Sequence, residues 1–474
     1  MVMLKMNDLL KFVSLPQEYP EKVLPQIRKQ DFAEIYKQLD LEQAANQASR
    51  CSQCGVPFCQ VHCPLGNNIP DWLRLTVEGR LKEAYEVSAS TNTFPEICGR
   101  ICPQDRLCEG NCVIEKDFGS VTIGSIERYI TENAFANEWV EAPTPLNENG
   151  MSVAIIGAGP AGLAAADMLR RKGYGVEIYD RYDRVGGLLI YGIPSFKLEK
   201  EVVERRRKLF EQAGIKFTLN CEIGKDIDFA EIRKKHNAVL IATGVYKARD
   251  VDLPENSLNG IYSALDYLTA SNRIGLGDKV EQYYDGSLNA YDKHVVVIGG
   301  GDTAMDCVRT AIRQGAKKVS CLYRRDKANM PGSVREVKNA EEEGVEFIWL
   351  AAPKAFVGNN GNVEQILAEK MRLASQESGR AAPVVIENSQ FALKADMVIK
   401  ALGFEPEDLP KMFAQPELEV SRNGTLKIDS RQMTSLDGVF AAGDIARGAS
   451  LVVWAIKDGR EAAEAIDRRL SIKA

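Results

Sequence analysis

Apolar residues recur with two different periods along this chain, and the change of period separates an N-terminal region from the rest. From Met151 onward, short apolar runs such as SVAII, VEIY and VVVI are each followed by polar turns or by stretches with helical spacing. The order strand, glycine-rich turn, helix, strand occurs at 152–181 and returns at 294–325. The copies begin about 140 residues apart, which is too long for a solenoid repeat, so the pattern predicts two separate α/β folds.

Three later apolar runs predict further strands, at AVLIATG (238–244), DMVIKALG (396–403) and GVFAAGD (438–444). The last residues predict a closing helix from Leu451 to Leu470, interrupted at Gly459.

The region before Met151 has helical rather than strand periodicity. FAEIYKQLDLEQAANQA (32–48) has apolar residues at helical spacing, and a helix is predicted from Ile123 onward. EAPTPLNENG (141–150) is rich in Pro, Asn and Gly and predicts a linker. No stretch approaches the roughly 18 apolar residues of a membrane helix, and no apolar N-terminal segment precedes a small-residue cleavage site. We therefore expect a cytoplasmic protein with no membrane association.

Composition narrows the chemistry. The chain has 474 residues with a formal net charge of −6, which argues against a nucleic-acid surface, and its three His residues exclude a His-rich metal site. Eleven Cys are present, and eight of them lie between Cys51 and Cys112. Such a density in a cytosolic protein of this size indicates metal or redox chemistry rather than a disulfide framework.

The cysteine spacing favours iron–sulfur clusters. The first run is Cys51-x2-Cys54-x4-Cys59-x3-Cys63-Pro, and the second is Cys98-x3-Cys102-Pro, followed by Cys108 and Cys112. A 4Fe–4S cluster uses closely spaced thiolates, and in two-cluster ferredoxins the Cys before such a Pro ligates the other cluster. Two clusters with interleaved ligands are therefore predicted. Structural zinc is the alternative, but four-thiolate zinc sites commonly use paired C-x2-C knuckles, and this block has one.

The first glycine-rich turn is typical of an FAD site. Gly157, Gly159 and Gly162 form G-x-G-x-x-G between a strand and a helix. Asp180 ends the next strand, where its carboxylate can accept a hydrogen bond from a ribose hydroxyl. Near the C-terminus, Gly443 and Asp444 follow a strand, and Asp444 is a candidate ligand of the ribityl chain. A helix N-cap role for Asp444 is compatible with that. Pro160, Ala161 and Gly187 complete the candidate FAD set.

The second turn favours NADPH. Gly299, Gly301 and Ala304 form G-x-G-x-x-A, and Arg324 and Arg325 stand where the first site has its acid. Arg at this place accommodates a 2′-phosphate, although a solvated basic pair is the alternative. Neither α/β region contains Cys-x-x-Cys, so output through a redox disulfide is not expected.

Long motifs in the chain resemble the small (β) subunits of NADPH-dependent glutamate synthases. They include NQASRCSQCGVPFCQVHCP, GGLLIYGIPSFKLEKEVVERRR, GGGDTAMDCVRTAIRQGAKKVSCLYRRD and FAAGDIARGASLVVWAIKDGREAA. The resemblance runs from about residue 25 to the C-terminus. Related arrangements occur in the N-terminal part of dihydropyrimidine dehydrogenase and in bifurcating ferredoxin:NADP oxidoreductases.

The resemblance implies particular site residues. One cluster would be held by Cys51, Cys54, Cys59 and Cys112, and the other by Cys63, Cys102, Cys108 and a non-Cys ligand, for which Glu127 is the candidate. Cys98 would be the spare cysteine, and whether Glu127 or Cys98 completes the second cluster stays open. For FAD the resemblance adds Leu188 and Lys197, and for NADPH it adds Asp302, Thr303 and Gly403.

Taken together, the sequence predicts an α/β protein with an N-terminal helical iron–sulfur domain (1–148), a discontinuous FAD-binding domain (149–250 and 400–474) and an NADPH-binding domain (251–399). Its expected cofactors are FAD, NADPH and two 4Fe–4S clusters. We expect no catalytic side chain, because hydride transfer between the two rings needs no protein acid or base. The resemblance implies a partner, the glutamate synthase large subunit, an FMN and iron–sulfur protein.

Three alternatives stay open at this point. The chain could serve ferredoxin or another reductase, act as a redox sensor without turnover, or be a flavin reductase that carries zinc in place of the clusters.

Overall fold

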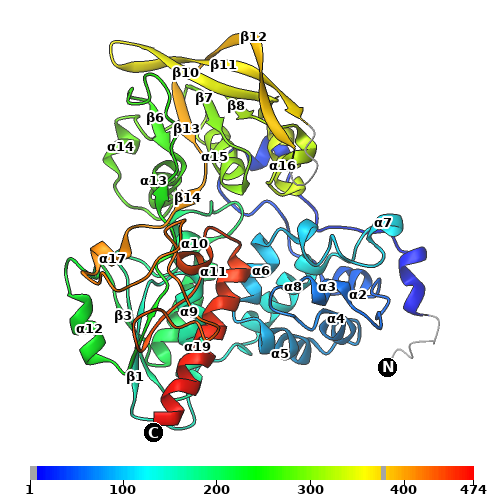
Figure 1. Cartoon of the computed structure of the whole chain (residues 1–474). Coiled ribbons are helices and arrows are strands. Elements are labelled where there is room, and N and C mark those ends of the chain that lie inside the picture. The colour runs from blue at the N-terminus through cyan, green and yellow to red at the C-terminus, as the bar shows by residue number, and fades with distance from the viewer. Residues whose placement is uncertain (1–7, 375–380, 474) are drawn as a thin grey trace.

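The computed structural model describes residues 8–374 and 381–473 and contains a helical N-terminal region followed by two α/β regions (Figure 1). In the view of Figure 1, the helical region lies beside the first α/β region and the second α/β region lies above both. Within the described residues, no helix has the combination of length and apolarity that crossing a membrane requires. This arrangement agrees with the fold class predicted from the sequence.

The N-terminal region packs its helices around the buried side chains of Trp72, Ile126 and Ile130. Its longer helices are α2 (Leu41–Ala48), α4 (Ile69–Val77), α5 (Leu81–Thr91), α6 (Pro95–Ile101) and α8 (Ile123–Ala136). Its short helical turns are η1 (Asp8–Val13), α1 (Pro25–Arg28), α3 (Phe58–Val61), η2 (Gln104–Arg106) and α7 (Glu115–Phe118). The helix predicted from Ile123 is confirmed, and residues 141–150 contain neither helix nor strand, as predicted for a linker.

The helix predicted over 32–48 is correct only in its second half. Asp40 is the N-cap of α2, and its carboxylate accepts a hydrogen bond from the Gln43 N–H in a capping box, which starts the helix at Leu41. The preceding residues instead pair with chain further upstream, since the Val23 N–H donates to the Ile35 carbonyl at 2.9 Å. We call residues 18–39 the strap; it carries α1 to the second α/β region, where α1 contacts α16 (Val334–Glu343).

The first α/β region contains a five-stranded parallel sheet in the order β15-β4-β1-β2-β3. Its strands are β1 (Ser152–Ile156), β2 (Gly175–Tyr179), β3 (Lys216–Thr218), β4 (Ala238–Ile241) and β15 (Val439–Ala441). The helices are α9 (Pro160–Arg171), α10 (Leu188–Tyr191), α11 (Lys200–Gln212), α12 (Phe229–Lys235), α17 (Leu409–Met412), α18 (Asp444–Arg447) and α19 (Val452–Lys473). Because β15 comes from near the C-terminus, the region is discontinuous in sequence.

The second α/β region contains the parallel sheet β6-β13-β7-β8-β9. Its strands are β6 (Ile261–Ser263), β7 (His294–Ile298), β8 (Lys318–Tyr323), β9 (Glu346–Trp349) and β13 (Met397–Lys400). Besides α16, its helical elements are α13 (Ala264–Gly275), α14 (Glu281–Tyr284), α15 (Asp302–Arg313) and η3 (Lys327–Asn329). The two α/β regions are joined by a small antiparallel pair, β5 (Lys247–Ala248) with β14 (Phe404–Glu405).

Two features differ from the sequence-based expectations. An antiparallel sheet of β10 (Ala351–Asn359), β11 (Asn362–Ala374) and β12 (Ala382–Lys394) covers the second α/β region and had no predicted counterpart (Figure 1). The closing helix α19 continues through Gly459, so the predicted interruption there is wrong. A Cβ at Gly459 would lie 2.1 Å from the Ala161 carbonyl oxygen, which shows that this glycine lets α19 approach α9 closely.

Candidate functional site

The first glycine-rich turn joins β1 to α9 in a conformation that depends on its glycines. Gly157 has a φ of +113°, and a Cβ there would lie 2.3 Å from the Ala242 carbonyl oxygen. A Cβ at Gly162 would lie 2.1 Å from the Gly157 carbonyl oxygen, so this glycine sets the packing of helix on turn. Gly159 is the N-cap of α9, and nothing lies within 4 Å of its Cβ position. The N-terminus of α9 is therefore open to a phosphate group.

A cavity opens beside this turn, with a volume of about 780 Å³ when the solvent space at its mouth is included. From the predicted FAD set it is lined by Gly157, Gly159, Pro160, Ala161, Asp180, Leu188, Gly443 and Asp444. The other lining residues were not named in the predicted set, and they are Ile101, Leu189, Ile193, Ala242, Thr243, Gly244, Tyr246, Ala442, Ser450, Leu451, Val452 and Ala455. Three predicted residues, Gly162, Gly187 and Lys197, do not line it, although a Cβ at Gly187 would lie 3.0 Å from the Gly159 Cα.

The cavity continues past Asp180 into a neighbouring one of about 460 Å³. There Arg181 forms two hydrogen bonds of 2.9 Å with the Glu407 carboxylate, and its guanidinium lies 4.9 Å from the centre of the Tyr246 ring. Tyr182 also lines this part. Flat aromatic and guanidinium surfaces of this kind suit a stacked base.

Two carboxylates face the elongated space, and of these Asp180 is buried and Asp444 is half-buried. Asp180 accepts hydrogen bonds from the N–H groups of Ala158 and Tyr182, at 2.7 and 2.9 Å, and burial raises its pKa. Asp444 begins α18, and burial raises its pKa from 3.8 to about 7. The hydroxyl groups of a bound nucleotide could donate hydrogen bonds to these carboxylates. The far end of the cavity is apolar and is lined by Ile101, Ile193 and Leu451. This donor set and shape fit an FAD molecule with its adenosine toward Arg181 and its flavin ring toward Ile101.

The second turn repeats the backbone geometry of the first. Gly299 has a φ of +145°, and a Cβ there would lie 2.3 Å from the Ala401 carbonyl oxygen. Gly301 is the N-cap of α15 and, like Gly159, has nothing within 4 Å of its Cβ position. Ala304 is buried in the first turn of the helix, beside Thr303. The backbone therefore provides a second open helix N-terminus.

The surroundings of the second turn are different. The Gly332 N–H donates to the Gly300 carbonyl at 2.9 Å, and the Ser333 N–H donates to the Asp302 carboxylate at 2.9 Å. Arg106, from the helical region, forms an ion pair of 3.2 Å with Asp302 and also donates to the Pro331 carbonyl. Residues 330–333, which we call the cover loop, thus lie on the turn.

The predicted phosphate-binding arginines follow β8. Arg324 is exposed and has no ion pair within residues 8–374 and 381–473, whereas the Arg325 Nε donates to the Ala381 carbonyl at 3.1 Å. Gly403 has a φ of +94° and lies at the crossing between the two α/β regions, where the Arg249 N–H donates to its carbonyl. An exposed guanidinium at the end of β8 suits a 2′-phosphate.

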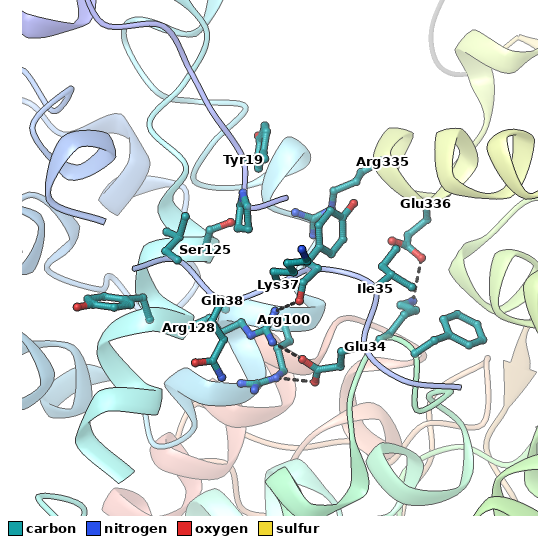
Figure 2. Close-up of a pocket in the computed structure, with 17 residues that line it drawn as sticks. Tyr19, Glu34, Ile35, Lys37, Gln38, Arg100, Ser125, Arg128, Arg335 and Glu336 are labelled. Carbon is teal, nitrogen blue, oxygen red and sulfur yellow. Dashed lines mark hydrogen bonds and ion pairs between the residues drawn. The ribbon is translucent and has the colours of Figure 1, made fainter. Parts of the chain in front are cut away.

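Lys197 contacts the other α/β region. Its Nζ lies 2.8 Å from Asp306 of α15 and 3.9 Å from Glu336 of α16. It also lines a cavity of about 670 Å³ at the junction of the strap, the helical region and α16. Figure 2 shows this junction, where Glu34 of the strap lies between Arg100 and Arg128, with ion pairs of 2.7 Å to each. The charges here join the three regions to one another.

The first four-cysteine set lies around one apolar cavity. Cys51, Cys54, Cys59 and Cys112 all line a space of about 350 Å³, together with Pro57, Phe58, Pro70, Leu73, Val113, Ile114, Val121 and Ile123. Burial raises the pKa of Cys51 to about 11 and that of Cys59 to about 12, and neighbouring thiols contribute to both shifts. Thiolates gathered in such a space need metal charge to be stable, so the donor set fits a cluster.

The second set is more deeply buried. Each of the thiols of Cys63, Cys102 and Cys108 interacts electrostatically with Glu127, and Cys63 does so with the other two. Burial raises the pKa of Glu127 to about 8, and its Oε1 accepts hydrogen bonds from Asn67 at 3.0 Å and Asn92 at 3.2 Å. Cys98 is also buried, and its thiol interacts with that of Cys102. Three thiols and a carboxylate therefore lie together, with Cys98 beside them.

No three His, Cys, Asp or Glu side chains of the described residues converge closely enough to hold a lone metal ion. A four-iron cluster differs from a lone ion because its own iron and sulfide atoms stand between its thiolate ligands.

The site residues that sequence reasoning missed come from distant segments. Ile101 lines the flavin end of the cavity although it lies on α6 of the helical region, directly before Cys102. Tyr246 and Arg181 lie just after predicted strand ends, so a search for aromatic or Arg residues at those positions could have found them. No local signal marks Ile101 or Ser450.

Comparison with known proteins agrees with this geometry. Residues 28–139 match the family model described as dihydropyrimidine dehydrogenase domain II, 4Fe-4S cluster, and residues 151–459 match the pyridine nucleotide-disulphide oxidoreductase model. The chain is 64% identical to the glutamate synthase (NADPH) small chain of Azospirillum brasilense, over 98% of this chain and 97% of that one. It is 46% identical to AegA, an Escherichia coli protein named as an oxidoreductase, over 96% of this chain and 70% of that one. Among solved structures, FprA from Mycobacterium tuberculosis shares the fold at 18% identity, with a TM-score of 0.59 over 68% of this chain and 85% of that one.

Proposed function

The chain belongs to the pyridine nucleotide-disulphide oxidoreductases and, within them, to the glutamate synthase (NADPH) small chains, and from this premise we propose the details of how it works. It is an NADPH-oxidising electron-input subunit that combines an FAD- and NADPH-binding oxidoreductase region with a 4Fe–4S domain. We propose that its acceptor is the FMN-containing large subunit of glutamate synthase, which forms glutamate from glutamine and 2-oxoglutarate.

The observation that carries this proposal is that Ile101 lines the flavin end of the cavity and is followed directly by Cys102. The same apolar core contains Cys98 and Cys102 together with Ala158, Ala161 and Leu189 of the first α/β region. A flavin seated in this cavity would lie against the iron–sulfur domain. Bound FAD would connect NADPH to the iron–sulfur clusters, because it accepts electrons in pairs and releases them singly.

We propose residue roles on the same basis. The pyrophosphate of FAD would be cradled by the first turn, that is by Gly157, Gly159, Pro160 and Ala161. Asp180 would accept a hydrogen bond from a hydroxyl of the adenosine ribose, and Asp444 would accept one from a hydroxyl of the ribityl chain. Gly299, Gly301 and Thr303 would hold the pyrophosphate of NADPH, and Arg324 its 2′-phosphate. Lys197 would act by holding the two α/β regions together. The domain limits 1–148, 149–250 with 400–474, and 251–399 are supported by which strands share each sheet.

We propose two 4Fe–4S clusters in a fixed order. The set of Cys63, Cys102, Cys108 and Glu127 would hold the cluster on the flavin side, because Cys102 follows Ile101. Cys51, Cys54, Cys59 and Cys112 would hold the outer cluster. The loops of this outer set expose apolar side chains, with Val56 60%, Phe58 47%, Val61 64% and Val113 56% accessible, which supports docking of the large subunit there.

Anaerobic co-purification with the large subunit tests the function. We expect NADPH oxidation that depends on both glutamine and 2-oxoglutarate, and oxidation only with an artificial dye would contradict this acceptor. Iron and sulfide analysis of the purified chain tests the cluster count: about eight iron atoms per FAD are expected, and four would reduce the proposal to one cluster. Cys112→Ser should remove the outer cluster and leave FAD reduction by NADPH intact.

A second acceptor is favoured by one observation, the 46% identity to the oxidoreductase AegA, whose chain is longer than this one. In that case the cofactors would be the same but the electrons would go to another reductase or to ferredoxin. An anaerobic pull-down with this chain as bait distinguishes the two acceptors. Retention of the large subunit would support the first acceptor, and retention of ferredoxin or another reductase would support the second.

A further inference from the structure

Lys200 is the first residue of α11, and its ammonium group is buried behind the apolar end of the flavin cavity. Its Nζ donates a hydrogen bond of 3.0 Å to the Leu189 carbonyl and another to the Ile193 carbonyl. Both of these residues line the cavity. The ammonium group is therefore held by backbone carbonyls of two residues that line the cavity.

No carboxylate of the described residues forms an ion pair with Lys200. The Asp306 carboxylate attracts the ammonium group of Lys200 electrostatically without forming an ion pair with it, and it is already paired with Lys197 at 2.8 Å. Burial lowers the pKa of Lys200 to about 7. The two lysines of this loop thus differ: Lys197 is neutralised by an acid of the other α/β region, and Lys200 is held by backbone carbonyls.

The position of Lys200 is unfavourable for a cation in one more respect. It stands at the N-terminus of α11, where the helix dipole is positive. The carbonyl groups that it binds come from α10 and the residues just after it, and a cation at the C-terminal end of a helix is favourable, which offsets part of this effect. Burial without a counter-charge disfavours the protonated form, which is why the pKa of Lys200 falls to about 7. A negative charge arising close to this amine would favour its ammonium form and would be stabilised by it.

Hydride transfer supplies that charge. It moves two electrons and one proton from NADPH to the flavin, so the nicotinamide leaves as a cation and the bound flavin becomes one unit more negative. We propose that Lys200 is a positioning residue for the flavin, holding the Leu189–Ile193 wall and stabilising the negative charge that reduction adds at this end of the cavity. This inference rests on the proposed FAD site.

The test is the midpoint potential of FAD in the purified full chain, measured by anaerobic spectroelectrochemical titration. Lys200→Met removes the charge but keeps a long side chain. We expect the equilibrium constant for FAD reduction to fall about tenfold, which for a two-electron couple is about 30 mV. Lys200→Arg keeps the charge and should restore the equilibrium constant to within about twofold of that of the unaltered chain, which is about 9 mV. Lys208→Met is the matched control, because it removes a cation that is 53% exposed on the same helix, and it should leave the potential unchanged.

The outcomes separate this inference from the proposed function. If the unaltered chain contains no FAD, or if NADPH does not reduce its FAD, the proposed function fails. If the unaltered chain behaves as proposed but Lys200→Met retains its FAD with the same potential, the role of Lys200 is wrong. Should Lys200→Met not fold, Lys200→Gln provides the same neutral substitution with an amide that can still donate to the carbonyls.

Discussion

The two glycine-rich turns have nearly the same backbone but opposite surroundings. Gly157 and Gly299 both have positive φ, and a Cβ at either would lie 2.3 Å from a carbonyl oxygen of the neighbouring strand end. The first turn opens into the cavity that the carboxylates of Asp180 and Asp444 face. The second turn is overlaid by the cover loop, which is held there by a hydrogen bond from the Ser333 N–H to the Asp302 carboxylate.

On the proposed assignment, this difference would separate a resident cofactor, FAD, from an exchangeable substrate, NADPH. A cavity lined by segments far apart in sequence, from Ile101 to Ala455, offers a ligand many contacts and can hold it through many turnovers. A turn bordered by one short loop and an exposed arginine, Arg324, can admit a nucleotide and let it leave. On the proposed assignment, the shared motif would bind the phosphate groups of both nucleotides, and its surroundings would decide how long each stays bound.

Glycine-to-alanine substitutions test this comparison with the largest expected effects. Gly157→Ala should remove FAD, because a side chain at a φ of +113° and 2.3 Å from a carbonyl forces the turn apart. Gly299→Ala should retain FAD and lose NADPH-driven flavin reduction by about 100-fold or more, while dithionite still reduces the flavin. FAD content and stopped-flow reduction rates measure the two effects.

Gly275→Ala is the control for both, since nothing lies within 4 Å of its Cβ position at the end of α13. Equal loss of FAD in Gly157→Ala and Gly299→Ala would show that the two turns do not have separate ligands.

Arg324→Ala should have the next largest effect, confined to the second turn. Hydrogen bonds to a charged group contribute about 1.5–3 kcal/mol, so we expect KM for NADPH to rise about tenfold or more with kcat little changed. KM for NADH, which lacks the 2′-phosphate, should stay the same. A uniform rise in KM for both nucleotides would argue against a phosphate-binding role.

The sequence was most informative where structure is local. Both turns and their flanking strands and helices were predicted, because glycine spacing and apolar runs specify them within about 30 residues. The cavity could not be derived in the same way. Ile101 and Tyr246 reach it only because α6 and the chain after β4 pack beside the first sheet, which is a tertiary effect.

The errors have similar causes. Gly459 resembles a helix breaker, yet α19 passes through it because the glycine permits close contact with α9. Periodicity over 32–48 predicted one helix, but Ile35 and Leu39 are buried by an extended strap rather than by a helical face. In each case contact with another region overrode the local preference.

Asp180→Asn sharpens the comparison at the first turn with a smaller effect. The amide keeps the shape of the side chain but loses the negative charge that would strengthen a hydrogen bond accepted from a ribose hydroxyl. FAD affinity should therefore fall about tenfold. Reconstitution of the apoprotein with FAD, followed by fluorescence, measures the dissociation constant. NADPH binding should not change, and a change there would mean that the two sites are coupled.

Arg106→Ala should have the smallest effect, because the ion pair with Asp302 joins side chains that are 41% and 35% exposed, and such pairs contribute about 0–1 kcal/mol. Arg106 also donates to the Pro331 carbonyl, so its loss should free the cover loop from the second turn. We expect KM for NADPH to fall by up to about fivefold with FAD content unchanged. Arg74→Ala, which breaks an exposed pair with Glu78 elsewhere in the helical region, should change neither quantity. If KM instead rises in Arg106→Ala, the cation attracts the nucleotide, and the cover loop is part of the binding site rather than a barrier to it.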